Sequence, residues 1–201
     1  MKNRFFLLAA GLFAAVMAFS APVGSKGGRF TVDANGTQVR FAQGNLQYHV
    51  RNKVWQFAVR QDSVIGEPNE GRIEANYNNW IDLFAWGTSG YNNKNPEMYS
   101  YTNSDYAYGN KTDIAGTNYD WGVNCAISNG GNQAGLWRTL TKDEWMYLFN
   151  NRTNASQLMG FGAVNGLIGF ILLPDGWTTP AGGHFTPVAE DRAQNNYTLV
   201  D

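Results

Sequence analysis

Hydrophobic and polar residues alternate with a period of two in the first part of the chain, which is the pattern of half-buried β-strands. Residues 29–42 predict one hairpin, with its turn at Asn35-Gly36, a dipeptide typical of tight hairpin turns. Residues 46–59 predict a second hairpin, and its alternation places Trp55 or Phe57 against the core. Together the two hairpins predict an N-terminal β-meander.

The period changes to that of a helix after residue 140. Thr141 can cap a helix, and Glu144, three residues later, can close a capping box. Trp145 and Leu148 then fall on one apolar face of the same helix. The pattern predicts one capped helix near residues 141–151.

The segment between Ile65 and about Asn124 is rich in Gly, Asn, Asp and Tyr and has no helical period. Its apolar island, Trp80–Trp86, predicts a buried strand or a short helical turn. Seven of the ten tyrosines lie between Tyr77 and Tyr119. Tyrosine offers a large contact area at little cost in rotamer entropy. These tyrosines therefore either form a ligand surface or cover the core, with Asn and Gly making the turns. The candidate ligand-binding residues are Tyr91, Tyr99, Tyr101, Tyr106, Tyr108 and Tyr119.

The N-terminus has the organisation of an export signal. A short basic start, Met1–Arg4, precedes an apolar run from Phe5 to Phe19, and small residues lead to Ser20. We expect a signal peptide over residues 1–20 and a single domain over 21–201. An N-terminal membrane anchor is the alternative, although the apolar run is short for a span. The protein is expected in the periplasm, on the cell surface or in the medium, with no membrane span after cleavage.

Composition narrows the class of partner. Cleavage would remove Lys2 and Arg4 and no acid, so the formal charge moves from −1 to −3. A mildly acidic chain without a basic stripe is a poor nucleic-acid binder, so we expect no nucleic-acid partner. Cys125 is the only cysteine, which excludes an intrachain disulfide. We expect a buried, inert thiol there, with a catalytic thiol as the alternative.

The segment from Trp137 to Trp145 reads Trp-Arg-Thr-Leu-Thr-Lys-Asp-Glu-Trp. It resembles the Trp-Arg-Leu-Pro-Thr-x-x-Glu-Trp signature of formylglycine-generating-enzyme-like domains. The chain resembles Fibrobacter-type major paralogous domains and related Bacteroidota surface proteins more closely than it resembles the enzymes. In those proteins, as here, an apolar strand ending near a proline follows the capped helix, and that strand spans residues 166–177. Segments 41–48 and 80–87 also look similar.

The resemblance implies an α+β, strand- and loop-rich fold of the C-type-lectin-like class. It departs at two places: Thr139-Leu140 stands where Leu-Pro is usual, and the Trp-containing closing strands have no counterpart after Trp177. We therefore expect an incomplete domain with an exposed strand edge. The reactive cysteines of the enzyme family are not matched, so that activity does not carry over. The structural motif consists of Trp137, Arg138, Thr141, Glu144 and Trp145.

Three functions remain open on the sequence. A binding module would use the tyrosine-rich loops to hold an extracellular glycan or a protein partner, with calcium as a possible cofactor held by Asp and Asn oxygens. A polysaccharide hydrolase would need two loop carboxylates at the right separation. A structural piece of a larger envelope protein is the third. Because the common catalytic motifs are missing, we favour binding over catalysis. The candidate carboxylates are Asp82, Asp105, Asp113, Asp120 and Asp175.

Overall fold

The structure is a computed structural model that describes residues 23–65, 78–82, 84, 87–89 and 113–199. Among these residues the fold is a strand-rich α+β arrangement with few helices, as expected from the sequence. Residues 1–20 and five of the six candidate tyrosines lie outside the described residues. The elements in chain order are β1 (Phe30–Thr31), β2 (Gln38–Val39), β3 (Leu46–His49), β4 (Val54–Phe57), β5 (Trp80–Ile81), α1 (Trp121–Asn124), α2 (Lys142–Asn150), η2 (Ala155–Gln157), β6 (Met159–Val164), β7 (Leu167–Leu172), η3 (Arg192–Gln194) and β8 (Asn196–Tyr197).

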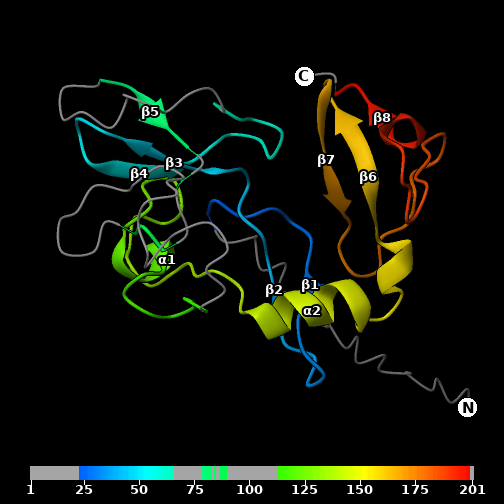
Figure 1. Cartoon of the computed structure of the whole chain (residues 1–201), viewed down its shortest axis with the longest axis horizontal. Helices are drawn as coiled ribbons and strands as arrows, with labels where there is room; N and C mark the ends of the chain where they lie inside the picture. The colour runs from blue at the N-terminus through cyan, green and yellow to red at the C-terminus, as the bar shows by residue number, and fades with distance from the viewer. Residues whose placement is uncertain (1–22, 66–77, 83, 85–86, 90–112, 200–201) are drawn as a thin grey trace, which may run out of the picture.

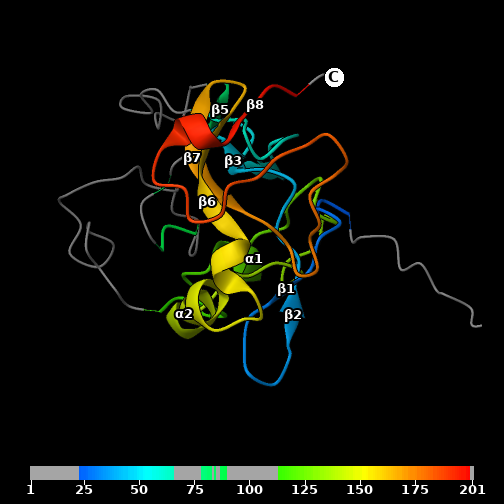
Figure 2. The same ribbon diagram turned by 90° about the vertical axis from the view of Figure 1, so that its right-hand side faces the viewer.

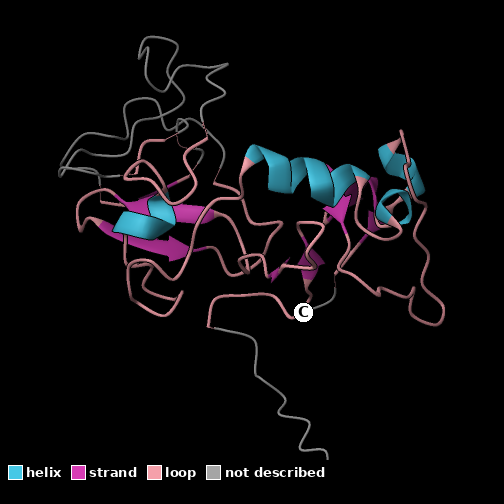
Figure 3. Cartoon of the chain, turned by 90° about the horizontal axis from the view of Figure 1, so that it is seen from below, coloured by secondary structure: helices cyan, strands magenta, loops and turns pink. Residues whose placement is uncertain are grey.

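The described strands form three small sheets, in the orders β1–β2, β4–β3–β5 and β7–β6–β8. Figure 1 shows the second and third sheets on opposite sides of the molecule, with α2 and the β1–β2 hairpin below and between them. Figure 2 shows the same hairpin and helix beneath β6 and β7, and Figure 3 shows α2 from below, between the two larger sheets. The helix α2 therefore lies where the β1–β2 hairpin and the two larger sheets meet.

The first predicted hairpin is present, but its strands are short. Phe30 pairs with Val39, and the turn is closed by the Asp33 carboxylate, which accepts from the backbone N–H groups of Asn35 and Thr37 at 2.9 and 3.0 Å. Gly36 has φ +82°, which a side chain would disfavour. The prediction of a continuous meander is wrong, because this hairpin and the next one belong to different sheets.

The second hairpin supplies the first core cluster. Tyr48 pairs with Trp55, and both Trp55 and Phe57 point inward because residues two apart on a strand share a face. Ile81 of β5 is fully buried beside them, so the start of the predicted apolar island is a strand. We call Tyr48, Val50, Trp55, Phe57, Ile81 and Ile127 the first core cluster.

The predicted helix is confirmed as α2. The side chain of Thr141 accepts from the backbone N–H of Glu144 at 3.1 Å, and the Glu144 carboxylate accepts from the backbone N–H of Thr141 at 2.8 Å. This reciprocal pair satisfies two helix-end donors. Leu148 is fully buried, and the Trp145 and Phe149 rings stack with centroids 5.4 Å apart. The second core cluster consists of Phe30, Val32, Leu140 and Leu148.

A long hairpin of β6 and β7 follows the helix. The apolar strand expected over residues 166–177 contains β7, whereas β6 was not predicted. The turn between them is Asn165-Gly166, and both residues have positive φ, +50° and +79°. This dipeptide is the strongest short-range hairpin signal, so it could have revealed β6. The parallel strand β8 covers the far edge of β6.

Asp175, just after β7, joins this hairpin to the N-terminal strands. Its Oδ2 accepts from both the backbone N–H and the hydroxyl of Thr31 at 2.7 Å, and its Oδ1 pairs with Arg152 at 3.2 Å. The Arg152 side chain is fully buried and lies over the Phe30 ring. Burial lowers the pKa of Arg152, and the hydrogen bond from its guanidinium to Asp175 opposes that shift.

Among the described residues, the helices are all too short or too polar to cross a bilayer.

We predict that Asp175→Ala lowers the free energy of unfolding by about 3 kcal/mol, because it leaves the buried Arg152 charge without its carboxylate partner. Arg60→Ala is the matched control, since it breaks an Arg–Asp pair whose arginine side chain is 37% exposed; it should cost less than about 1 kcal/mol. Urea unfolding measures both values. Equal losses would mean that burial of the Arg152 pair is not what joins the hairpin to the N-terminal strands.

Candidate functional site

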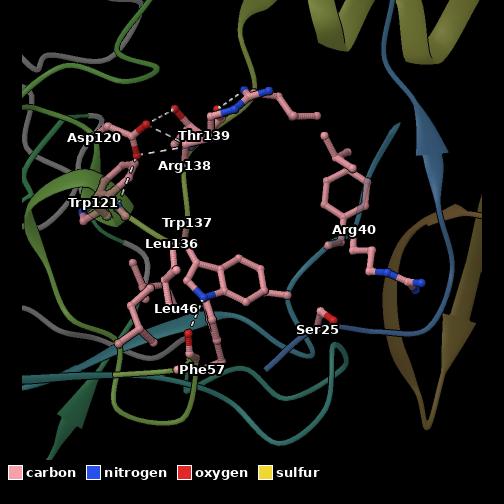
Figure 4. A pocket seen from close by; sticks show the side chains of 18 of the residues that line it. Ser25, Arg40, Leu46, Phe57, Asp120, Trp121, Leu136, Trp137, Arg138 and Thr139 are labelled. Carbon is pink, nitrogen blue, oxygen red and sulfur yellow. Dashed lines mark hydrogen bonds between the residues drawn. The ribbon is translucent and has the colours of Figure 1, made fainter. Parts of the chain in front are cut away.

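A cleft of about 960 Å³ opens between the two core clusters. Most of its lining is apolar. Its walls come from both N-terminal hairpins, the segment around α1 and the segment leading to α2, as Figure 4 shows. The residues that define it are Leu46, Phe57, Trp121, Ile127, Leu136, Trp137, Leu140 and Trp145, with Arg29, Gln38 and Arg40 at the β1–β2 side.

Two indoles shape the cleft, and their polar ends are already engaged. Trp137 packs edge-on against Phe57 with ring centroids 4.6 Å apart, and its Nε1–H donates to the carbonyl of Gly130 at 2.8 Å. The Nε1–H of Trp121 donates to the carbonyl of Thr88 at 2.8 Å. Because both N–H groups are satisfied inside the protein, the indoles contribute apolar surface to the cleft.

Asp120 sets the position of the cleft's upper wall. Its carboxylate is fully buried and accepts from the backbone N–H of Thr139 at 3.0 Å, of Gly116 at 2.9 Å and of Gly122 at 3.2 Å. It is also the N-cap of α1. One side chain therefore joins the α1 start to the segment before α2, and Figure 4 shows it pointing at Thr139.

Gly122 permits the close contact on which this wall depends. A Cβ at this position would lie 1.9 Å from the backbone oxygen of Trp137, a distance that real atoms do not reach. The carbonyl of Gly122 also accepts from the N–H of Gly135 at 2.8 Å. The backbone of α1 thus packs directly on the Trp137 segment, which only glycine allows.

Arg138 lies at the mouth of the cleft but its charge is paired. Its guanidinium donates to both carboxylate oxygens of Glu144, at 2.7 and 2.5 Å. Hydrogen bonding to Glu144 raises the pKa of Arg138, and the same contact lowers the pKa of Glu144. Figure 4 shows the Arg40 side chain extending away from Trp137, and its guanidinium donates to the carbonyl of Gly27. The interior of the cleft is therefore apolar.

The structural motif predicted from the sequence is brought together here. Trp137, Arg138 and Trp145 line the cleft, while Thr141 and Glu144 form the helix cap beside it. Sequence reasoning missed the role of Asp120 as the wall of this cleft. Its position directly before Trp121-Gly122 is a helix-cap signal that was available.

The predicted tyrosine surface is described only at Tyr119. Its side chain is 44% exposed and it directly precedes Asp120, but it does not line the cleft. Tyr91, Tyr99, Tyr101, Tyr106 and Tyr108 lie outside the described residues. A ligand surface built from these tyrosines stays a prediction.

All four of the described candidate carboxylates have hydrogen-bond partners. Asp82 is fully buried and accepts from the N–H of Ile65 at 2.8 Å, while Asp120 and Asp175 hold the contacts given above. Asp113 is exposed and accepts from the N–H of Ala115. Asp105 lies outside the described residues. Each described carboxylate thus accepts a local backbone or side-chain donor.

Metal ligation was a further expectation for the loops. Within the described ranges, the structure holds no group of three or more His, Cys, Asp or Glu side chains that could bind a metal ion. The possible calcium site stays a prediction.

Cys125 packs against the first core cluster, half-buried, and its Sγ donates to the carbonyl of Ser89 at 2.8 Å. Desolvation by burial raises the pKa of its thiol to about 11. A thiol with a raised pKa is a weak nucleophile at neutral pH, which fits the expected inert cysteine.

Comparison of the chain with protein-family models, curated proteins and solved structures finds no match.

We predict that Asp120→Asn lowers the free energy of unfolding by about 2 kcal/mol, because the amide turns one acceptor into a donor facing backbone N–H groups. Asp113→Asn is the matched control, as an exposed aspartate that also accepts a backbone N–H; it should change stability by less than about 0.5 kcal/mol. Thermal and urea unfolding measure both. A neutral Asp120→Asn would show that α1 and the Thr139 segment are joined without the carboxylate.

We predict that native Cys125 reacts slowly with a thiol-specific disulfide reagent. Its pKa is raised from 9.0 to about 11, so about a hundredfold less thiolate is present at pH 8 than for an unperturbed thiol. The rate should rise with pH until the pH passes through the raised pKa. The same chain in guanidinium is the control and should react at the ordinary rate. Equal native and unfolded rates at pH 8 would show that burial does not raise the pKa of the native thiol.

Proposed function

We propose that this protein is a non-catalytic binding module that holds an apolar or aromatic group of its ligand in the cleft between the two core clusters. The observation that carries the proposal is the chemistry of the lining: aromatic and aliphatic walls in which Asp120 and both indole N–H groups already have partners. A concave apolar site of this size is the usual form of a ligand pocket.

The same chemistry selects the ligand. A saccharide brings many hydroxyls, each of which loses water on burial and needs a new partner. The interior of this cleft has few polar atoms left to supply one. An apolar anchor, such as a hydrophobic side chain of a protein partner, therefore fits the cleft better than a sugar ring.

The scaffold and the compartment belong to the same proposal. The capping box of α2 and the Trp137–Trp145 segment support a C-type-lectin-like scaffold, and the N-terminal signal supports export. A glycan remains the second candidate ligand, favoured by the exposed ring of Tyr119 and by the tyrosine-rich segment that precedes it.

Binding of the apolar dye 1-anilinonaphthalene-8-sulfonate tests the cleft. Leu136 lines it and is 53% exposed, so Leu136→Glu adds a charge to the mouth without touching the core. We expect the variant to bind the dye about tenfold more weakly, because burying a carboxylate beside an apolar ligand is costly. Dye fluorescence measures the affinity.

The matched control is Met146→Glu, on the outer face of α2, where the side chain is 51% exposed and does not line the cleft. It should leave dye binding unchanged. Both variants should unfold at the same temperature as the parent chain. Equal dye affinity in the two variants would remove the cleft as the binding site. A soluble glycan that binds without displacing the dye, and whose binding is lost in Tyr119→Ala, would favour the glycan instead.

A further inference from the structure

Strand β7 lines a second surface, next to the cleft, that shares Phe41, Ala42 and Trp145 with it. Among the described strands, β7 forms an edge of its sheet, with β6 on one side only. Edge strands expose a row of backbone N–H and C=O groups, and proteins usually protect them with charges, prolines or bulges. The six residues of β7, Leu-Ile-Gly-Phe-Ile-Leu, contain none of these protective residues. The edge is therefore chemically open to another strand.

The register shows which backbone groups point outward. The N–H of Leu173 donates to the carbonyl of Leu158 at 2.8 Å, one step beyond the Met159–Leu172 pair. In an antiparallel ladder, hydrogen-bonded pairs alternate with pairs that are not hydrogen-bonded. Ile171, Gly169 and Leu167 therefore point their backbone groups at β6.

The backbone N–H and C=O groups of the alternate residues Ile168, Phe170 and Leu172 consequently point away from β6. The far edge of β6 confirms the register, since the N–H groups of Phe161 and Ala163 donate outward to the carbonyls of Ala189 and Asn195. Among the described residues, no hydrogen bond reaches the outward groups of Ile168, Phe170 and Leu172. Three successive positions of one strand edge are thus unpaired.

These unpaired groups face a groove. It has a volume of about 810 Å³ and runs between β7 and an opposite wall made by Ala42, Gly44, Asn45, Gln61 and Asp62, with Lys26 at its side. Figure 1 shows β7 on the side of its sheet that faces the β3–β4–β5 sheet. The groove therefore has one wall of unpaired strand and one wall of small and polar residues.

An aromatic row gives the groove a second binding element. Phe41, Trp145, Phe149 and Phe170 are in successive ring contact, with centroids 5.6, 5.4 and 5.7 Å apart. All four line the groove. Phe170 is 46% exposed, and its cross-strand partner Phe161 extends the row with 49% exposure. Side chains of an added strand on this face would therefore meet aromatic rings.

We propose that this groove binds an extended segment of a partner polypeptide, which adds to the sheet as a strand beside β7. The unpaired groups of Ile168, Phe170 and Leu172 supply the main-chain hydrogen bonds. The aromatic row receives apolar side chains at every second position, and the residues between them point to the opposite face of the sheet, while the outer backbone edge of the added strand faces the polar wall. Strand addition of this kind gives affinity through the main chain and specificity through alternate side chains.

A second folded copy of the chain fits this groove less well than a peptide. Its own β7 would arrive with the rest of its sheet, and the opposite wall of the groove already faces the edge. A single extended segment brings no such bulk. The chemistry thus selects a flexible, apolar-alternating segment, without lysine or glutamate on the side facing the aromatic row.

The test uses residues 21–201, which follow the expected signal peptide, together with a defined peptide probe. The probe is the fluorescent peptide acetyl-Thr-Ile-Thr-Phe-Thr-Ile-Lys-amide, with the dye on its lysine, and fluorescence anisotropy measures binding. Two control peptides carry N-methyl groups, one on the Ile and Phe nitrogens and the other on the Thr nitrogens. Either the Ile and Phe N–H groups or the Thr N–H groups of a bound strand can face β7, but not both. We therefore expect the peptide that is methylated on the groups facing β7 to bind about tenfold more weakly than the other.

Variants of β7 give the matching test on the protein. Ile168→Pro removes one outward N–H while its bonding to β6 is untouched, as prolines on edge strands allow. It should weaken binding of the probe about tenfold, whereas Ile168→Thr, which keeps the N–H, should weaken it less than about threefold. If Ile168→Pro fails to fold, the N-methylated peptides alone test main-chain pairing with β7, since they leave the protein unchanged.

Three results would overturn the proposal. The first is no anisotropy change up to about 1 mM protein, an affinity too weak for a specific site. The second is equal weakening by both N-methylated peptides, which would show side-chain adsorption without strand pairing. The third is a dimer in sedimentation that Ile168→Pro dissociates, which would make a second copy the occupant. Loss of dye binding in Leu136→Glu does not change the anisotropy, N-methyl or sedimentation results. The proposals for the groove and for the cleft can therefore be rejected independently.

Discussion

The carboxylate of Asp120 is the interaction on which the rest of the site depends. A fully buried carboxylate is stable only when donors replace the water it has lost. Here those donors are backbone N–H groups of Gly116, Gly122 and Thr139, which come from segments about twenty residues apart in the chain. Satisfying one charge therefore fixes the start of α1, the close packing of Gly122 on the Trp137 backbone, and the entry to α2. The indoles of the cleft lie where this arrangement places them.

Two core clusters, rather than one, explain why both a cleft and a groove exist. The first cluster is built on β3, β4 and β5, and the second on β1, α2 and the segment before it. Because the small sheets do not form one continuous sheet, apolar faces are left between them, and the cleft lies between these faces. On the other side of α2, the pair of buried Arg152 and half-buried Asp175 joins the base of the β6–β7 hairpin to β1. At the tip, the Asn165 side chain donates to the Asp62 carboxylate at 2.9 Å, so the groove along β7 lies between these two contacts.

Local signals predicted local structure well and long-range pairing poorly. The capping box at Thr141 and Glu144, and the turn at Asn35-Gly36, are complete within a few residues, so the sequence was enough to predict α2 and the first hairpin. The division of the strands among separate sheets depends on contacts between distant segments, and the predicted meander was wrong for that reason. Asp120 and Asp175 looked like loop acids in the sequence. Their roles depend on Thr139 and Arg152, which the fold brings to them.

The cleft and the groove differ in one physical property that separates their ligands. In the cleft, the polar atoms of Asp120, Trp121 and Trp137 already have partners, so a ligand gains by displacing water from apolar surface. Along β7, the outward groups of the strand have no partner among the described residues, so a ligand gains by pairing a backbone. An apolar anchor satisfies the first surface and an extended chain satisfies the second. A single partner with an apolar anchor flanked by an extended tail would satisfy both, and its two parts would then bind with the benefit of a raised effective concentration.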